Sequence, residues 1–154
     1  CFNPETWNFN YGNPFTLSVE DELIEKLRPS YIKGLSILGG EPFEPNNQLG
    51  LIDFIKKVKN IYPYKTIWCY TGYTFETDLL DPTSHVYIDV TRDMLNNIDV
   101  LVDGEFKEDL KDISLKFRGS SNQRLIDSKK SINENKVCEV EKYKELEKCF
   151  ANNT

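Results

Sequence analysis

Three short, largely apolar runs, each followed at once by a glycine-containing turn, are the feature of this sequence that most constrains its fold. Short apolar runs of this kind are typical of strands that are covered on both faces. Segments with helical spacing lie between them, and this alternation favours an α/β fold with a parallel sheet and helical crossovers, either an open doubly wound sheet or part of a barrel. The runs and their turns are Leu35–Leu38 before Gly39 and Gly40, Thr66–Tyr70 before Gly72, and Val100–Val102 before Asp103 and Gly104.

Two helices are predicted, one on each side of the first run. Ser18 and Asp21 form a pair similar to a capping box at the start of the first helix, and Pro29 ends it. The second helix covers Leu51–Ile61, where apolar residues keep helical spacing while lysines face outward, and Pro63 bounds it. Each helix therefore has one apolar face that can pack on the sheet.

The segment from Thr74 to Asn97 has a less regular pattern. It predicts a helical piece over Phe75–Leu80, an extended patch over Val86–Val90 and a second helical piece over Met94–Asn97. Beyond the third apolar run, Leu115–Phe117 predicts one more strand.

The composition changes after Asp127, where Ser, Asn, Lys and Glu become frequent. We expect a polar linker there, followed by an amphipathic helix over Lys136–Phe150 in which apolar residues recur at roughly every third position. The chain is therefore predicted to consist of a main domain over residues 1–127 and a C-terminal appendix over residues 128–154.

Charge and composition exclude several classes of function. The 154-residue chain has a formal net charge of −6, whereas a nucleic-acid binder needs clustered Lys and Arg to displace counterions, so we expect no nucleic-acid partner. No run approaches the roughly 20 apolar residues that span a bilayer, so we expect no membrane partner and a cytoplasmic location. A free chain normally starts with Met, and the start at Cys1 predicts that upstream residues were removed or left out.

The four cysteines, at positions 1, 69, 138 and 149, show neither a CxxC pair nor a regular spacing. By themselves they indicate neither a zinc site nor a disulfide framework. Cys69 lies inside a predicted strand and is interpreted as a small buried hydrophobic residue. Cys138 and Cys149 are interpreted as structural or incidental.

The turns after the three apolar runs are where a ligand is expected, because ligands of parallel α/β folds bind at the carboxyl ends of the strands. A pair of glycines, as in Gly39–Pro42, lets a ligand approach the backbone with no Cβ in the way. On its own, such a pair is more often a tight strand-to-helix turn. Asp103 is equally compatible with binding ribose hydroxyls or a cation and with capping a strand end.

Five segments of the chain carry a resemblance to one known family. Cys1–Trp7 (CFNPETW) looks like a segment that starts at the last cysteine of a Cys-x3-Cys-x2-Cys cluster motif, and Gly39–Pro42 (GGEP) is similar to a motif that contacts the methionyl amino group of S-adenosylmethionine (SAM). Trp68–Tyr73 (WCYTGY), Val100–Phe106 (VLVDGEF) and Phe117–Arg124 (FRGSSNQR) resemble further blocks of the same proteins. The family is that of the radical SAM activating proteins of anaerobic ribonucleotide reductase.

This resemblance extends from Cys1 to about Asp127, and it implies a fold, a cofactor and a reaction. The fold would be a partial (β/α) barrel of the radical SAM type with parallel strands, its first strand missing from this sequence, and a C-terminal helix. In such enzymes three cysteine thiolates hold a [4Fe-4S] cluster whose fourth iron binds SAM. The reaction is reductive cleavage of SAM to methionine and a radical that makes a glycyl radical on the partner.

The resemblance also assigns residues to the site. Cys1 would be a metal ligand of the [4Fe-4S] cluster. The first two cysteines of the motif are absent from this sequence, so the chain as written is not expected to hold a stable cluster. The residues expected to bind the cofactor are Phe2, Gly39, Gly40, Glu41, Pro42, Tyr70, Thr71 and Asp103.

The partner implied by the resemblance is the catalytic subunit of anaerobic ribonucleotide reductase, with a flavodoxin-like or other low-potential protein as electron donor. Two alternatives stay open. One is activation of another glycyl radical enzyme such as pyruvate formate-lyase, against which the FRGSSNQR block argues; the other is a non-catalytic fragment that keeps the fold and partner binding. Residues Arg118–Arg124 are interpreted as a structural turn in preference to a partner contact, and His85 as a surface residue.

Overall fold

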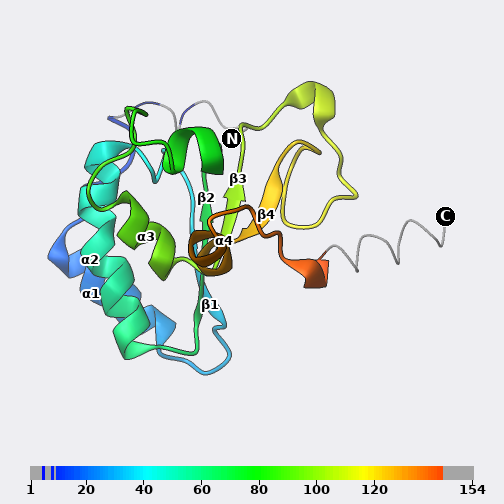
Figure 1. The fold of residues 1–154 in the computed structure, drawn as a ribbon. Helices are drawn as coiled ribbons and strands as arrows, with labels where there is room; N and C mark the ends of the chain where they lie inside the picture. Colours follow the sequence, from blue (N-terminus) through cyan, green and yellow to red (C-terminus); the bar gives the residue numbers. More distant parts are fainter. Residues whose placement is uncertain (1–4, 6–7, 9, 144–154) are drawn as a thin grey trace.

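The computed structural model describes Glu5, Asn8 and residues 10–143, and its centre is a four-stranded sheet in the order β1-β2-β3-β4 (Figure 1). β1 runs parallel to β2 and β2 parallel to β3, whereas β3 and β4 are antiparallel. The predicted α/β class is therefore confirmed, but the four described strands form an open, mostly parallel sheet, and the expected partial (β/α) barrel is not confirmed. The strands are β1 (Gly34–Ile37), β2 (Thr66–Tyr70), β3 (Val100–Asp103) and β4 (Arg124–Asp127).

The expectation that all strands run parallel is wrong for β4. A parallel return needs a crossover connection, usually a helix, that carries the chain back to the starting end of the sheet. After β3 the chain instead makes an excursion over residues 104–123, which contains the short 3-10 helix η3 (Glu108–Leu110). It therefore re-enters the sheet beside β3 in the opposite direction.

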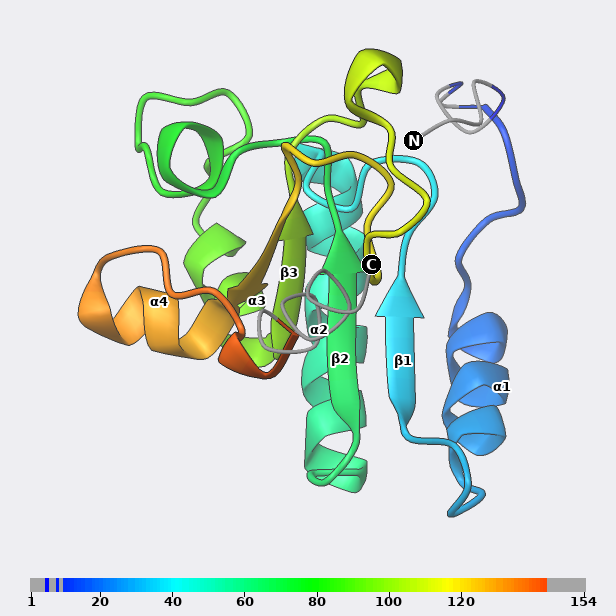
Figure 2. The ribbon, with the colours of Figure 1, turned by 90° about the vertical axis from the view of Figure 1, so that its right-hand side faces the viewer.

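In the edge-on view of Figure 1, the helices α1, α2 and α3 all lie on one side of the sheet. In the turned view of Figure 2, α2 and α3 lie behind the strands and α1 stands beside the β1 edge. A fourth, α4, packs against α3. Their apolar side chains form one continuous cluster with residues of the strands. The helices are α1 (Leu17–Leu27), α2 (Pro45–Ile61), α3 (Thr91–Asn97), α4 (Ser128–Glu134) and the π-helix η2 (Phe75–Leu79).

Successive residues of each strand point to opposite faces of the sheet. In β2, Ile67 and Cys69 are fully buried in the cluster under the helices, while Trp68 and Tyr70 belong to a smaller cluster on the opposite face. Burial also raises the pKa of the Cys69 thiol well above its ordinary value. The interpretation of Cys69 as a small buried hydrophobic residue is confirmed.

Both predicted helices exist, but their starts differ from the prediction. The side chain of Thr16, not that of Ser18, caps α1, since the Thr16 hydroxyl accepts a hydrogen bond from the Val19 amide at 3.4 Å. α2 begins at Pro45, six residues before the predicted start at Leu51. Proline is favoured in the first helical turn because its missing N–H would have no partner there.

The predicted extended patch over Val86–Val90 is not a strand. Val86 is fully buried, and its carbonyl accepts a hydrogen bond from the Gln48 side-chain amide at 2.7 Å. A side chain of α2 therefore satisfies this backbone group, so that it needs no neighbouring strand. The helical pieces predicted on either side correspond to η2 and to α3, which begins at Thr91.

The strand predicted over Leu115–Phe117 is also absent from the structure. Phe117 has a positive φ of 61°, a left-handed conformation that a strand residue does not adopt. The excursion is closed further along by an isolated antiparallel bridge between Lys111 and Ser120. Residues 112–119 therefore form the tip of a loop.

Helix α4 lies where a polar linker was expected. The Ser128 hydroxyl donates to the Leu95 carbonyl at 2.7 Å, and the Ser131 hydroxyl donates to the Asp127 carbonyl at 2.6 Å and accepts from the Cys138 amide at 2.8 Å. Because both serines are buried and paired with backbone groups, the polar composition does not mark a linker here.

The amphipathic helix predicted over Lys136–Phe150 begins later than expected. Residues 136–140 are not helical: Lys136 lies in a bend, Glu139 forms a bridge with Ile126 of β4, and helical structure begins at residue 141. The predicted helix over residues 144–150, including Cys149, lies outside the described residues. Cys138 is buried, which agrees with a structural role.

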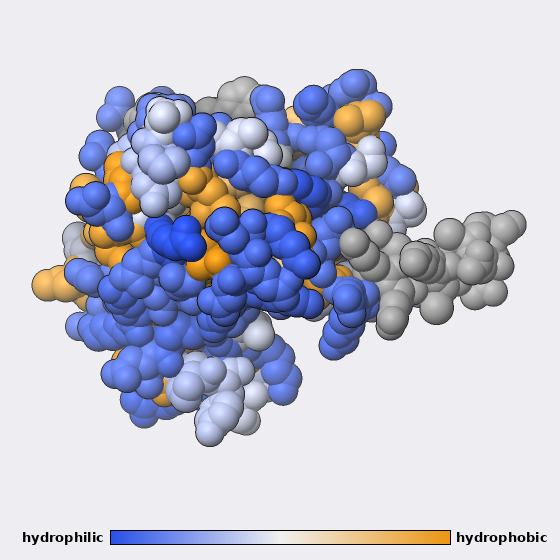
Figure 3. All heavy atoms as spheres, in the orientation of Figure 1, coloured by the Kyte–Doolittle hydropathy of each residue, from blue (hydrophilic) through white to orange (hydrophobic). Residues whose placement is uncertain are grey.

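The surface agrees with the acidic, hydrophilic composition. On the face shown in Figure 3, polar side chains cover most of the molecule and apolar residues gather in smaller patches. Among the described residues, none of the helices combines the length and the apolar character that a membrane span requires.

Candidate functional site

The turns after β1 and β2 are joined by the carboxylate of Glu41. Its Oε1 accepts hydrogen bonds from the Thr71 hydroxyl at 2.6 Å and the Phe43 amide at 3.0 Å, and its Oε2 accepts one from the Gly72 amide at 2.8 Å. These turns follow neighbouring parallel strands, so they lie at the same edge of the sheet. The structure thus brings the predicted site residues Glu41 and Thr71 into direct contact.

The environment of Glu41 changes its acidity. Burial raises the pKa of this carboxyl above its ordinary value, while the hydrogen bonds from Thr71, Gly72 and Phe43 act in the opposite direction. With three donors directed at it, the carboxylate serves to hold the two turns together.

Gly39 and Gly40 present exposed backbone at this edge. Their φ angles are +84° and +55°, in the left-handed region that favours glycine. A Cβ on Gly39 would meet nothing within 4 Å, so the backbone conformation, not lack of space, requires glycine there. The next residues differ, because Pro42 is buried and Glu41 is held by its hydrogen bonds.

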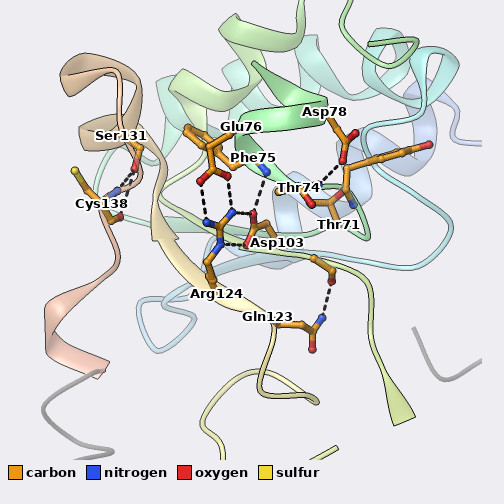
Figure 4. A network of polar contacts seen from close by, with 12 residues as sticks. Thr71, Thr74, Phe75, Glu76, Asp78, Asp103, Gln123, Arg124, Ser131 and Cys138 are labelled. Carbon is orange, nitrogen blue, oxygen red and sulfur yellow. Dashed lines mark hydrogen bonds and ion pairs between the residues drawn. The ribbon is translucent and has the colours of Figure 1, made fainter. Parts of the chain in front are cut away.

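Asp103, at the end of β3, is paired inside the protein. Its carboxylate is 1% exposed and accepts hydrogen bonds from the Phe75 amide at 2.9 Å and from the Arg124 Nε at 3.0 Å (Figure 4). Arg124 stands directly opposite Asp103 in the antiparallel register of β3 and β4. Of the two interpretations left open for Asp103, the structure therefore supports a structural role.

The glycine after Asp103 is fixed on both sides. The Gly104 amide donates to the Tyr73 carbonyl at 2.9 Å, and the Gly104 carbonyl accepts from the Gln123 side chain at 3.0 Å. The other end of the Gln123 amide accepts from the Gly119 and Ser120 amides. The turn predicted over Arg118–Arg124 is confirmed, and β4 begins at its last residue.

A hollow of about 530 Å³ opens at this edge of the sheet. Gly72 and Thr74 line it from the segment after β2, Gly104 and Lys107 from the segment after β3, and Arg124 from β4. All three parts of the chain therefore contribute to one concave surface at the carboxyl ends of β2 and β3.

An aromatic cluster covers the face of the sheet opposite the helices. The rings of Trp68, Phe117 and Tyr143 lie 5.0–5.6 Å apart between centroids. The Tyr70 hydroxyl donates to the Phe117 carbonyl at 3.0 Å, and burial raises the pKa of Tyr70. A second hollow, of about 390 Å³, lies beside this cluster and extends along β1 to Ser36.

Two further polar residues lie near the turn after β2. The Tyr73 hydroxyl donates to the Glu44 carboxylate at 2.5 Å, and burial followed by this hydrogen bond raises the pKa of Tyr73. The ring of His85 is exposed and lies 5.8 Å from that of Tyr73. The prediction that His85 is a surface residue is confirmed.

The proposed cluster ligand cannot be placed, because Cys1 and Phe2 lie outside the described residues. Cys69 and Cys138 are both buried. Among residues 10–143, with Glu5 and Asn8, no group of three or more His, Cys, Asp or Glu side chains is arranged to hold a metal ion.

Sequence reasoning missed the contacts of Arg124. It identified Asp103 as a site residue and FRGSSNQR as a block, but not that Arg124 pairs with Asp103 and Glu76. The opposite charges of Asp103 and Arg124, which stand on either side of residues 104–123, were an available signal. It could not be used without knowing that β4 pairs with β3.

Comparison with known proteins adds the family. The model of a family described as a 4Fe-4S single cluster domain matches residues 1–126. The anaerobic ribonucleoside-triphosphate reductase-activating protein of Escherichia coli K12 is 41% identical over 125 residues, which are 80% of this chain and 75% of that protein. The protein of that name from Enterobacteria phage T4 is 38% identical over 126 residues, 81% of this chain and 72% of its own length.

The chain belongs to the anaerobic ribonucleoside-triphosphate reductase-activating proteins. The resemblance found in the sequence is thereby confirmed, together with a 4Fe-4S domain as the matching family model. No solved structure matches the chain.

The region that matches the family model corresponds to a defined part of the structure. It ends at Ile126, inside β4, and therefore includes all four strands except one residue, the three turns at their carboxyl ends, and Arg124. α4 and the segment that follows it lie beyond the match. The family similarity thus coincides with the part of the chain that builds the candidate site.

Proposed function

We propose that this chain activates anaerobic ribonucleotide reductase by reductive cleavage of SAM at a [4Fe-4S] cluster, and that it thereby places a glycyl radical on the catalytic subunit. The observation that carries the proposal is the bond between the GGEP and WCYTGY turns through Glu41, at the edge where a parallel sheet binds ligands. The family membership and its 4Fe-4S domain support the same reaction.

The chain's own residues fit a SAM molecule at this edge. Gly39 and Gly40 offer exposed peptide groups to the methionyl amino and carboxylate groups, because their left-handed backbone carries no side chain. Glu41 and Pro42 hold that turn against the core. Tyr70 and Thr71 follow on the neighbouring strand, so that they line the same edge.

The cluster is assigned to Cys1 and to the two cysteines that precede it in the family's motif. Cys69 and Cys138 are buried and unsuitable as ligands. When bound, the cluster supplies the electron that cleaves SAM, and the radical fragment removes a hydrogen atom from a glycine of the partner. Phe2 is proposed to lie beside SAM.

The protein contributes to the reaction by positioning the partner's glycine next to the reactive carbon. A carbon radical takes whichever hydrogen atom is nearest, so selectivity requires the partner's glycine to lie within a few ångströms of the reactive carbon. We propose that the catalytic subunit inserts a glycine-bearing loop at the carboxyl ends of the strands. A flavodoxin-like or other low-potential protein is the proposed electron donor, and the location is proposed to be cytoplasmic.

The test uses the complete protein, with the Cys-x3-Cys-x2 segment present upstream of Cys1. After anaerobic reconstitution it should bind close to four irons per chain. Reduced and supplied with SAM, it should produce the doublet of a glycyl radical in electron paramagnetic resonance when mixed with anaerobic ribonucleotide reductase. Pyruvate formate-lyase serves as the second partner and should give no doublet.

Each other outcome has a defined meaning. A doublet that appears with the lyase alone would move the assignment to the activating enzymes of that partner. SAM cleavage without a radical on either protein would leave a radical SAM enzyme with another target. A complete protein that holds no cluster would favour the non-catalytic alternative, and the variant Cys1→Ser should lose iron if the ligand assignment is right.

A further inference from the structure

Arg124, the first residue of β4, joins three separate parts of the site edge. Its Nε and Nη2 donate to the two oxygens of Asp103, and its Nη1 and Nη2 donate to the two oxygens of Glu76 at 2.9 and 2.6 Å (Figure 4). Two carboxylates are thus bound by one planar guanidinium, each through a pair of hydrogen bonds. β4, the end of β3 and η2 are held together at one point.

The charges explain why an arginine is needed there. Asp103 is 1% exposed, and a buried carboxylate without a cationic partner is strongly destabilising. Glu76 lies on the more open side of Arg124, with a side chain 47% exposed. Hydrogen bonds from Arg124 lower the pKa of Glu76, and bonds to Glu76 and then Asp103 raise that of Arg124. The Glu76 carboxylate therefore stays ionised beside Arg124.

The contacts of Arg124 fix the turns that line the hollow. Asp103 also accepts from the Phe75 amide, which sets the start of η2 directly after the Thr71–Thr74 segment. Gly104 follows Asp103, and its amide holds the Tyr73 carbonyl at 2.9 Å. A change at Arg124 therefore reaches both the turn after β2 and the turn after β3.

We infer that Arg124 is a positioning residue for SAM binding, which acts through Asp103 and Glu76 to hold the turns after β2 and β3 in the geometry that the ligand needs. This inference rests on the proposed function. It also gives Asp103 a definite part, because the buried carboxylate transmits the position of β4 to Gly104.

The experiment measures SAM affinity in the complete, cluster-loaded protein. Titration calorimetry is done with the cluster oxidised, so that SAM is bound and not cleaved. Arg124→Met should weaken SAM binding by about tenfold, which is the lower end of the loss that follows removal of a residue that supports a metal ligand. Arg124→Lys keeps the positive charge but loses the planar guanidinium with its paired donors. Its SAM affinity should lie between that of Arg124→Met and that of the wild type.

Lys111→Met is the matched control. Lys111 pairs with Glu108 at 3.1 Å in the same excursion, but both side chains are more than half exposed and neither lines the hollow. Its loss should leave SAM affinity unchanged. All titrations are made at a temperature at which circular dichroism shows each variant to be folded, so that a lower melting temperature alone cannot change the result.

A second measurement separates positioning from general stability. If Arg124 acts through Glu76, Glu76→Gln should weaken SAM binding less than Arg124→Met does, and the double variant should bind no more weakly than Arg124→Met alone. Additive losses would contradict that route and overturn the inference.

The inference and the proposed function can fail separately. If the wild type binds SAM and folded Arg124→Met binds it equally well, Arg124 only supports the scaffold and the inference is wrong. If the wild type holds its cluster but binds no SAM, both the proposed function and the inference are wrong.

Discussion

The two faces of the central sheet are built from alternate residues of the same strands, yet they differ in what covers them. On the helix side, Ile67, Cys69 and Leu101 are fully buried under α1, α2 and α3. On the other side, Trp68 and Tyr70 are half-buried beside a hollow, and Ser36 is exposed. One face is therefore covered by the helices, while the other carries a smaller apolar cluster with a hollow beside it.

The largest expected effect is on the helix side. Leu101→Ala should lower the free energy of unfolding by about 2–5 kcal/mol, because it removes buried methyl groups and leaves a cavity between the central strand β3 and the helices. Denaturant unfolding followed by circular dichroism measures it. Ile113→Ala is the control, since Ile113 is 95% exposed and its change should stay within about 0.5 kcal/mol. If Leu101→Ala changed the free energy of unfolding as little as Ile113→Ala does, the helix side of the sheet would not be the main source of stability.

A smaller effect is expected at Phe117, on the opposite face. The variants Phe117→Ala and Phe117→Gly both lose the ring contacts with Trp68 and Tyr143. At a φ of 61°, however, alanine keeps the strained left-handed backbone that glycine accepts freely. The free energy of unfolding of the glycine variant should therefore be about 1 kcal/mol higher than that of the alanine variant. Equal stabilities would mean that the backbone at 117 is not left-handed in solution.

The smallest effect is expected at the strand ends, as a pH dependence. Burial raises the pKa of Glu41 above 4.5, so the folded state binds its proton more tightly than the unfolded state. The free energy of unfolding of the wild type, compared with that of Glu41→Gln, should fall as the pH rises above 4.5. The difference between the two proteins should become constant above the raised pKa of Glu41. Denaturant unfolding of both proteins from pH 4 to 8 tests the sign. A difference that grows in the opposite direction would show that the hydrogen bonds outweigh burial.

Much of the parallel sheet could be predicted, because its signals are local. Each parallel strand combines an apolar run with a glycine turn, and β2 was predicted with its observed bounds, Thr66–Tyr70. β4 was missed because its pairing depends on Asp103 and Arg124, which are separated by 21 residues. α4 was missed because the buried Ser128 and Ser131 look like linker residues until their backbone partners are known.

In the candidate site, too, the local turns could be predicted from the sequence, but the contacts between residues distant in the chain could not. Gly39–Pro42 and the turn after β2 were identified as neighbours from the rule that parallel strands end at one edge. The bond between Glu41 and Thr71 spans 30 residues and could not be read from either turn alone. Asp103 shows the limit most clearly, since its residue type fits a ligand site and its partners assign it to the scaffold.

The way the sheet ends has a consequence for self-association. The outer edge of β4 is occupied, because the Asp127 amide donates to the Cys138 carbonyl and the Val140 amide to the Leu125 carbonyl. In the described part of the chain, β1 is the strand that keeps one side without a neighbour. Two molecules that paired through β1 would use up the open edge of both. Among the described strands, edge-to-edge association would therefore stop at a two-fold dimer, because a fibre needs a second free edge on every molecule.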